Sequence, residues 1–343
     1  MADAARKVRE IAGVAPDAIP FEALIEAEQP AVLKGLAAAW PLVGEGRTSP
    51  GAAIAYLKSF YQGRPVTAYR GPPGIGGRFF YDEAATGLNF EAKREMLDAF
   101  LDALAAHHDD AQPPAFYIGS TDVDTWLPGL RAENDLVLDH AMFAGEPPLV
   151  GIWIGNRTVA ATHYDMSYNF ACSLVGRRRF TLFPPDQVHN LYPGPLEPTP
   201  GGQVVSMVDA RAPDLDLYPR YRDALAAAQV AELEPGDVLY YPALWWHQVE
   251  ALDPFNVMIN YWWNLAPAFM DSPQNTLLHA LLSLRDRPEP EKRAWRELFD
   301  FYVFGAADQA GAHLPEGARG NLGPLDAHNA RRLRAQLLNR LNR

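Results

Sequence analysis

The chain has 343 residues, of which 48% are hydrophobic and 21% charged, a composition typical of a soluble globular protein rather than a disordered one. Its net charge of −12 argues against nucleic-acid or anionic-lipid binding through overall charge. The single cysteine, Cys172, excludes an intrachain disulfide framework and a cysteine-rich zinc site.

The N-terminal fifteen residues mix acidic and basic side chains and lack the apolar stretch of a signal peptide. No run approaches the roughly 18 apolar residues that a membrane span needs. A lone thiol also fits a reducing compartment. We therefore expect a cytoplasmic protein with no membrane partner.

Residues 1–148 show a mixed pattern that predicts an N-terminal α+β extension packing on a later core. Apolar residues at helical spacing predict helices at 20–25, 51–60 and 90–107. Short apolar runs that end at turn residues predict strands at 30–35, 66–69, 78–81 and 116–119.

Residues 149–268 change character, because short apolar runs alternate with turn residues. Strands are predicted at 150–154, 160–164, 169–174, 179–183, 204–207, 230–232, 237–241, 247–251 and 257–263, with a short helix within 218–229. So many short strands in one segment favour a mainly β fold, a sandwich or jelly roll.

Residues 269–343 are predicted to be helical. Ser272 and Pro273 are typical of a helix N-terminus, and this helix continues to about Leu284. Further helices are predicted at 289–304 and from Leu325 to the C-terminus. Helices outside a β core need a partner surface, so we expect this region to form a homodimer.

Thr162-His163-Tyr164-Asp165 carries the sharpest chemical signal in the chain. On a strand, His163 and Asp165 point to the same side, and a distant strand is expected to bring His247 beside them. Two imidazoles and one carboxylate leave three metal positions open, which is typical of non-haem Fe(II) oxygenases. The alternative is a hydrogen-bonded core histidine beside a surface aspartate.

Several longer motifs follow in a fixed order. They are Gly176–Pro185 (GRRRFTLFPP), Leu191-Tyr192-Pro193, Glu234–Pro242 (EPGDVLYYP), Trp245-Trp246-His247 and Asn260-Tyr261-Trp262. This ordered set resembles the cupin-like branch of the JmjC superfamily, to which the asparaginyl hydroxylase acting on hypoxia-inducible factor belongs. The segments Gln29–Gly35 and Phe116–Gly119 resemble the same family.

The resemblance implies a double-stranded β-helix that uses Fe(II), with 2-oxoglutarate as cosubstrate. Position by position, it implies that the catalytic metal ligands are His163, Asp165 and His247. It also implies cosubstrate contacts from Tyr117, Asn169, Arg178 and Asn260, with Arg178 and Tyr117 at the distal carboxylate.

Two positions depart from the family pattern. Arg178 stands in place of a lysine; it keeps the positive charge but differs in length and shape. Strand alternation also leaves open whether Arg177 or Arg179 is the inward residue. Ala160 stands in place of a threonine, and Thr162, of the same strand parity, is a candidate substitute.

Two functional hypotheses follow. The leading one is an Fe(II)- and 2-oxoglutarate-dependent dioxygenase, a hydroxylase of an unknown protein or small molecule. The alternative is a non-oxidative cupin-type protein that binds a small ligand, such as a sugar, in the same barrel. We expect no nucleic-acid partner, because the C-terminal arginine cluster belongs to an acidic chain and is typical of a solvated helix face.

Overall fold

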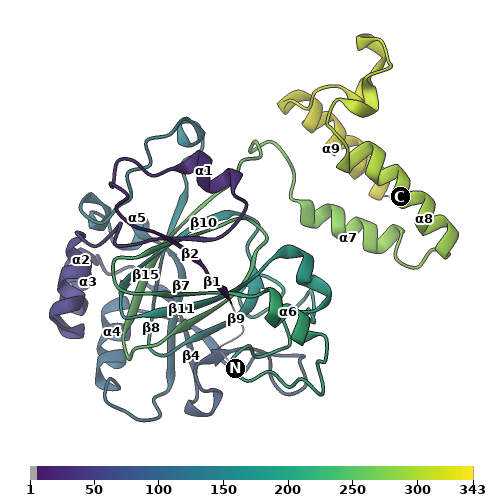
Figure 1. Cartoon of the computed structure of the whole chain (residues 1–343). Helices are drawn as coiled ribbons and strands as arrows, with labels where there is room; N and C mark the ends of the chain where they lie inside the picture. Colours follow the sequence, from purple (N-terminus) through teal and green to yellow (C-terminus); the bar gives the residue numbers. More distant parts are fainter. Residues whose placement is uncertain (1–5, 343) are drawn as a thin grey trace. The chain divides into compact units, whose positions relative to one another are not determined.

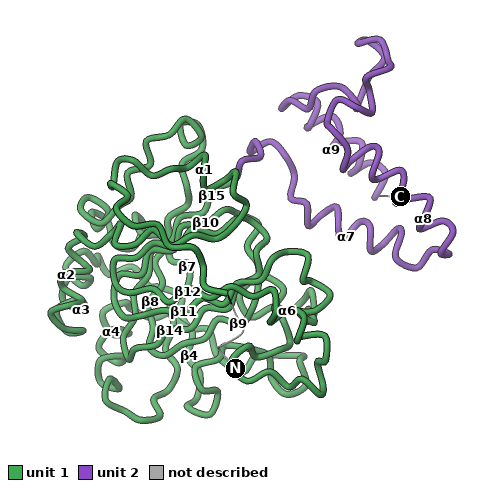
Figure 2. Tube along the Cα trace, viewed as in Figure 1, with its two compact units in different colours: residues 1–264 green, residues 265–343 purple. Residues whose placement is uncertain are grey.

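The computed structural model describes residues 6–342, and the chain divides into two compact units (Figure 2). Residues 1–264 form the first unit and residues 265–343 the second. The first unit contains both the predicted N-terminal region and the predicted β core. The second contains the predicted C-terminal helices.

Eight strands build the core of the first unit (Figure 1). They are β8 (Leu149–Gly155), β9 (Val159–Tyr164), β10 (Tyr168–Val175), β11 (Arg178–Phe183), β12 (Gln229–Leu233), β13 (Val238–Tyr241), β14 (Trp246–Ala251) and β15 (Asn256–Trp263). Strands β8, β10, β13 and β15 share one sheet, and β9, β11, β12 and β14 share the other. The chain thus crosses repeatedly between two sheets, as in a jelly roll, and the predicted mainly β fold is confirmed.

Strands of the N-terminal region extend both sheets. β1 (Arg6–Lys7) and β5 (Arg78–Phe79) complete a six-stranded sheet in the order β1-β12-β11-β14-β9-β5. A nine-stranded sheet has the order β2-β3-β13-β10-β15-β8-β7-β4-β6; its added strands are β2 (Arg9–Ile11), β3 (Ala31–Leu33), β4 (Val66–Gly71), β6 (Glu91–Glu95) and β7 (Ala115–Asp122). The N-terminal region is therefore part of the sheets themselves.

Helices cover the outer faces of the sandwich (Figure 1). They are α1 (Phe21–Glu26), α2 (Pro41–Thr48), α3 (Pro50–Phe60), α4 (Leu97–Ala106), α5 (Val123–Trp126) and α6 (Tyr221–Ala227). The larger apolar cluster joins Leu57 and Phe100 of the helices to Phe170 and Cys172 of β10. Alternate residues of the same strand, such as Ala171, face the smaller cluster between the sheets. This inner space also holds the candidate site.

The second unit contains α7 (Pro273–Ser283), α8 (Glu289–Phe299), a π-helical turn at Asp300–Phe304 and α9 (Ala327–Leu341), with three short 3-10 turns between Gln309 and Leu322. The Ser272 hydroxyl accepts a hydrogen bond from the Gln274 N–H and so caps α7, as its sequence indicates. Among the described residues, no helix is long and apolar enough to cross a membrane.

Two sequence predictions of local structure are wrong. Residues 91–95, expected as the start of a helix, form β6, because they pair along their whole length with Val66–Arg70. The apolar helical spacing begins only with Met96, and α4 begins at Leu97. Residues 204–207, expected as a strand, make only isolated bridges, among them the one that joins Val205 to His163.

Candidate metal centre

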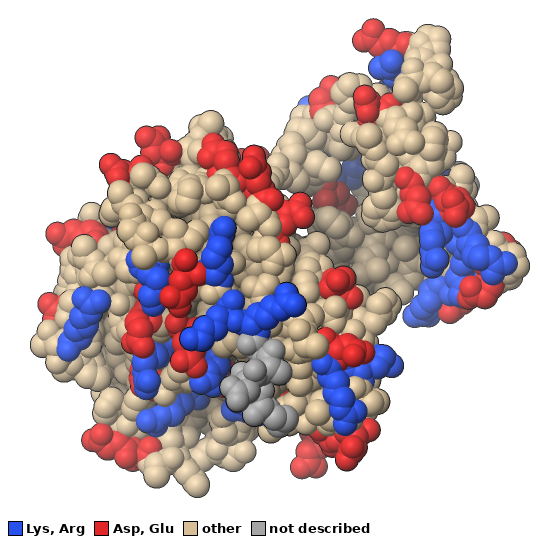
Figure 3. Space-filling model, in the orientation of Figure 1, with Lys and Arg blue, Asp and Glu red and all other residues tan. Residues whose placement is uncertain are grey.

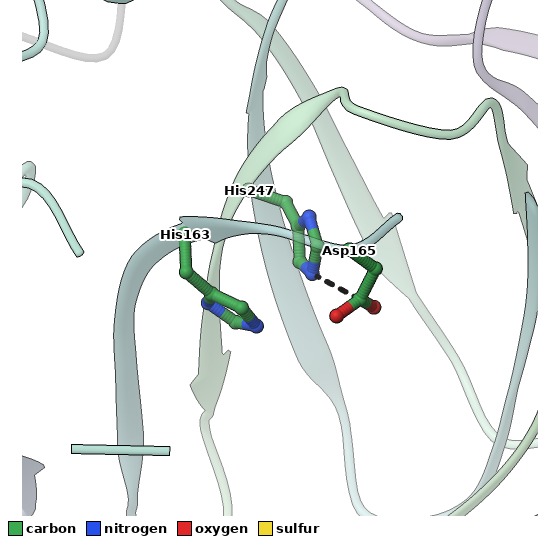
Figure 4. A group of neighbouring side chains, drawn as sticks. All are labelled: His163, Asp165 and His247. Atoms are coloured by element: carbon green, nitrogen blue, oxygen red, sulfur yellow. Dashed lines mark ion pairs between the residues drawn. The ribbon is translucent and has the colours of Figure 1, made fainter. Parts of the chain in front are cut away.

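His163, Asp165 and His247 lie together in the first unit (Figure 4). His163 lies near the end of β9, and antiparallel pairing places it directly opposite His247 of β14. The two imidazole centroids are 4.3 Å apart. One potential ligand atom from each of the three residues lies within 4.8 Å of the others. Strand pairing thus brings together the three residues that the sequence singled out as a metal-binding set.

Backbone carbonyls orient both imidazoles. Nδ1 of His163 lies 2.8 Å from the carbonyl oxygen of Ala161, and Nδ1 of His247 lies 3.0 Å from that of Trp245. A carbonyl only accepts hydrogen bonds, so each Nδ1 carries the proton. In the neutral imidazole, Nε2 is then the nitrogen with a free lone pair for a metal.

His247 is held in its neutral form. Its burial, together with the neighbouring His163, lowers the pKa of His247 to about 4, while the Asp165 carboxylate acts in the opposite direction. A neutral imidazole is the form that binds a metal. His247 is therefore ready for coordination at neutral pH without first losing a proton.

Asp165 is fixed through both its side chain and its backbone. Its Oδ2 accepts hydrogen bonds from the Trp262 indole at 3.1 Å and the Asn169 amide at 3.3 Å. Its carbonyl oxygen accepts one from the N–H of Leu244 at 2.8 Å. Two imidazole nitrogens and a carboxylate oxygen fit a divalent first-row metal, with three coordination positions left open.

The three residues line a cavity of about 410 Å³. Aromatic side chains make up much of its wall: Tyr69, Phe79, Phe90, Tyr117, Trp153, Phe180, Tyr241 and Trp262. Such a cavity is large enough for a small organic ligand, and its wall is mostly apolar with a few polar groups. The candidate metal site therefore opens onto a binding pocket.

Arg178 also lines this cavity and is only 3% exposed. Burial lowers the pKa of Arg178 to about 10, so the guanidinium still carries its charge at neutral pH. Its Nε is buried without a hydrogen-bond partner, and within residues 6–342 no ion pair to this side chain is found. A buried cation without a partner is unfavourable, so this position is suited to an anionic ligand.

The two neighbouring arginines point outward. Arg177 makes a bidentate pair with Asp253, with nitrogen–oxygen distances of 2.8 and 3.1 Å. Arg179 pairs with Glu232 at 2.7 Å. Of the three candidates that the sequence left open, only Arg178 faces the cavity, as strand alternation requires.

The remaining predicted cosubstrate residues occupy different places. Tyr117 and Asn260 line the cavity. Burial raises the pKa of Tyr117, so its phenol stays protonated and can donate a hydrogen bond. Asn169 is fully buried and does not line the cavity; its amide contacts Asp165. Thr162 is also buried, but it does not line the cavity. Its hydroxyl therefore does not take the place of the threonine that the family has at position 160.

Sequence reasoning missed two tryptophans. Trp262 donates to the Asp165 carboxylate, and Trp153 donates to Oδ1 of Asn260. For Trp262, strand alternation was the one available signal. It lies two residues after Asn260 on β15, so the two side chains share the inward face. Nothing in the sequence placed Trp153 beside Asn260, because that contact depends on the pairing of β8 with β15.

The chain matches one protein family and is similar to several known proteins. Residues 16–269 match the family described as the cupin-like domain. The chain is 34% identical to human HSPB1-associated protein 1 over 151 residues, which cover 42% of this chain and 30% of that protein. It is 27% identical to JmjC domain-containing protein D of Dictyostelium discoideum over 238 residues, 65% of this chain and 49% of the relative.

A third relative is lysine-specific demethylase 8 of Xenopus tropicalis. It is 26% identical over 244 residues, which cover 69% of this chain and 48% of the relative. The chain thus spans at most about half the length of these three relatives.

Proposed function

Because the chain belongs to the cupin-like branch of the JmjC superfamily, we propose that it is an Fe(II)- and 2-oxoglutarate-dependent oxygenase that hydroxylates its substrate. One observation carries this proposal. Two features line a single cavity. One is the set of two histidines and one aspartate, which leaves metal positions open; the other is the buried, unpaired guanidinium of Arg178. A dicarboxylate that chelates a metal at one end needs a cationic partner for the carboxylate at its other end, and this cavity contains both.

Each group would have a separate role. His163, Asp165 and His247 would hold Fe(II) on one side and leave the opposite positions to ligands. Arg178 would pair with the distal carboxylate of 2-oxoglutarate, and the Tyr117 phenol would donate to the same region. When bound, iron and 2-oxoglutarate would supply the oxidising chemistry with dioxygen, releasing succinate and CO₂.

The remainder of the cavity wall supports an uncharged substrate group. Apart from the three metal-site residues and Arg178, the lining residues carry no charged side chain; the polar ones include Ser120, Ser167 and Gln203. Aromatic and apolar side chains would exclude water around the reacting group. The substrate we propose therefore presents a neutral group, either on a protein side chain or on a small molecule.

The test is succinate formation from 2-oxoglutarate by the iron-loaded protein, with His163→Ala as the control. The proposal predicts succinate from the wild type and none above background from the variant. If 2-oxoglutarate neither binds nor turns over while a sugar does bind, the non-oxidative cupin hypothesis replaces this one. A neutral sugar would leave Arg178 without a charged partner, and for that reason we favour the oxygenase.

A further inference from the structure

A chain of hydrogen bonds leads from Trp153 to the candidate metal ligand Asp165. The Trp153 indole N–H donates to Oδ1 of Asn260. The Asn260 amide then donates to Oδ1 of Asn169 at 3.2 Å, and the Asn169 amide donates to Oδ2 of Asp165 at 3.3 Å. Four core strands or their ends thus contribute one residue each to a continuous path.

Both ends of this path fix its direction. An indole N–H only donates, and an ionised carboxylate only accepts. The two asparagine amides between them therefore have one arrangement in which every bond forms, with each oxygen toward Trp153 and each nitrogen toward Asp165. Asn169 is fully buried and Asn260 is 2% exposed, so solvent offers them little alternative.

The backbone leaves room for the two indoles. A Cβ on Gly151 would lie 2.9 Å from the ring of Trp262, and a Cβ on Gly119 would lie 2.9 Å from the ring of Trp153. The two indole rings meet edge to face, with centroids 5.7 Å apart. These contacts hold the indole donors in place at both Asn260 and Asp165.

The path also determines which carboxylate oxygen is available. Oδ2 of Asp165 accepts both the Asn169 and the Trp262 hydrogen bonds. No residue in the described part of the chain donates to Oδ1. Oδ1 is therefore the oxygen with more lone pairs left for a metal ion, while Oδ2 lies 3.8 Å from Nε2 of His247.

We propose that Trp153, Asn260 and Asn169 are positioning residues that act together to orient Asp165 for metal binding. This inference rests on the proposed function only in assuming that Asp165 binds a metal. It gives Asn169 a contact with the metal ligand beside the cosubstrate contact that the family resemblance implies. Trp153 touches no ligand atom and acts through two intervening amides.

Trp153→Phe tests the inference, because it removes the indole N–H donor while keeping an aromatic ring, although a smaller one. Co(II) is added to the metal-free protein, and its affinity and visible absorption spectrum are recorded. Loss of a direct hydrogen bond to a metal ligand typically weakens metal binding roughly 10- to 100-fold. Trp153 acts through two amides, and Asp165 keeps its bond from Trp262, so we expect a loss at or below the lower end of that range. The Co(II) spectrum should change as well, because the Asn260 and Asn169 amides are no longer held in one orientation.

Two matched variants accompany this measurement. Trp262→Phe, which removes the direct donor to Asp165, should also weaken Co(II) binding. Trp126→Phe removes an indole bond to the carbonyl of Pro65 that has no link to the site, and should leave binding unchanged. Thermal unfolding of each metal-free variant shows whether folding is preserved.

Wild-type Co(II) affinity and an unchanged spectrum in a folded Trp153→Phe variant would overturn the inference. This outcome does not depend on catalysis. If the wild type binds Co(II) but forms no succinate with iron, the oxygenase proposal fails, while weaker Co(II) binding by Trp153→Phe still supports the positioning role.

Discussion

Arg178 keeps its charge at neutral pH although it is almost fully buried. We predict that Arg178→Met weakens 2-oxoglutarate binding by roughly 30-fold or more, because losing one partner of a buried charge pair costs about 2–5 kcal/mol. Calorimetric titration of the Mn(II)-loaded protein measures this affinity. The matched variants Arg177→Met and Arg179→Met remove outward-facing charges and should bind 2-oxoglutarate as the wild type does.

The same variant distinguishes a binding role from a structural one. Removing a buried cation that has no partner should leave the free energy of unfolding of the ligand-free protein unchanged or raised. Urea denaturation of Arg178→Met and the wild type provides the comparison. A loss of several kcal/mol would mean that Arg178 stabilises the fold, and would count against a ligand-binding role.

The lowered pKa of His247 predicts that the metal-free protein becomes less stable at acidic pH. Its pKa is about 4 in the folded protein and near its ordinary value of 6.5 in the unfolded chain. Between these values the unfolded chain binds the proton more readily, so the free energy of unfolding falls as the pH drops from about 6.5 toward about 4. His247→Gln should flatten this dependence, as measured by urea denaturation across the pH range.

An exposed histidine serves as the control for this pH effect. His189 lies on the surface, so His189→Gln should keep the pH dependence of the wild type. Identical pH profiles for His247→Gln and the wild type would contradict the assignment of the effect to His247.

At the residue scale, the sequence identified the residues of the metal site but not the hydrogen bonds that hold them in place. His163 and Asp165 are two residues apart on one strand, and a spacing of two already implies a common face. The inward direction of Arg178 could not be chosen from alternation alone, because Arg177 and Arg179 have equal parity with each other. The contacts of Trp153 and Asn169 depend on the pairing of separate strands, which local patterns do not encode.

At the scale of elements, the loop between β13 and β14 holds the metal site through its backbone. Leu244 in this loop donates its N–H to the Asp165 carbonyl and has a left-handed backbone, with φ of 65°. Its side chain is 48% exposed. Such a conformation costs an ordinary residue about 1 kcal/mol or more, whereas asparagine tolerates it better.

We therefore predict that Leu244→Asn raises the free energy of unfolding by about 1 kcal/mol. Thermal or urea unfolding of the metal-free protein measures the change. Leu217→Asn is the matched control, since Leu217 is exposed without a left-handed backbone, and its stability should change little. A less stable Leu244→Asn would indicate that the leucine side chain itself supports the loop.

The strands of the core were predictable because each is short, apolar and bounded by turn residues. β6 was not, since Glu91–Glu95 has no apolar alternation and becomes a strand only by pairing with β4. α2 was not predicted either, since Gly44 and Gly46 lower its helix propensity and only Leu42 and Val43 are buried. In both elements, tertiary contacts outweigh local preference.

At the scale of the whole molecule, the visible face in Figure 3 has its charges distributed rather than concentrated. On the face shown in Figure 3, the Lys and Arg side chains lie interspersed with Asp and Glu. Mixed charges of this kind favour solubility more than phosphate binding. The absence of a nucleic-acid partner stays a prediction.

The second unit exposes many large apolar side chains. They include Leu277, Leu278, Leu282, Trp295, Leu298, Phe301, Tyr302, Val303, Phe304, Leu337, Leu338 and Leu341. Large apolar side chains exposed in such number are typical of an interaction surface. We propose that a second copy of the chain covers it, as the sequence led us to expect.

Light scattering coupled to gel filtration tests this proposal. We predict a dimer for the wild type and a shift toward monomer for the double variant Leu282→Glu/Leu338→Glu, which places charges on α7 and α9. Leu217→Glu, at an exposed leucine of the first unit, should stay dimeric. A wild type that is monomeric at all concentrations would contradict the proposal.

The most direct test of the account is a crystal structure of the protein soaked with Mn(II) and 2-oxoglutarate without oxygen. We predict anomalous density for one metal ion bound by Nε2 of His163, Nε2 of His247 and a carboxylate oxygen of Asp165. The far carboxylate of 2-oxoglutarate should contact the Arg178 guanidinium. A metal ion bound elsewhere, or 2-oxoglutarate lying away from Arg178, would contradict the account.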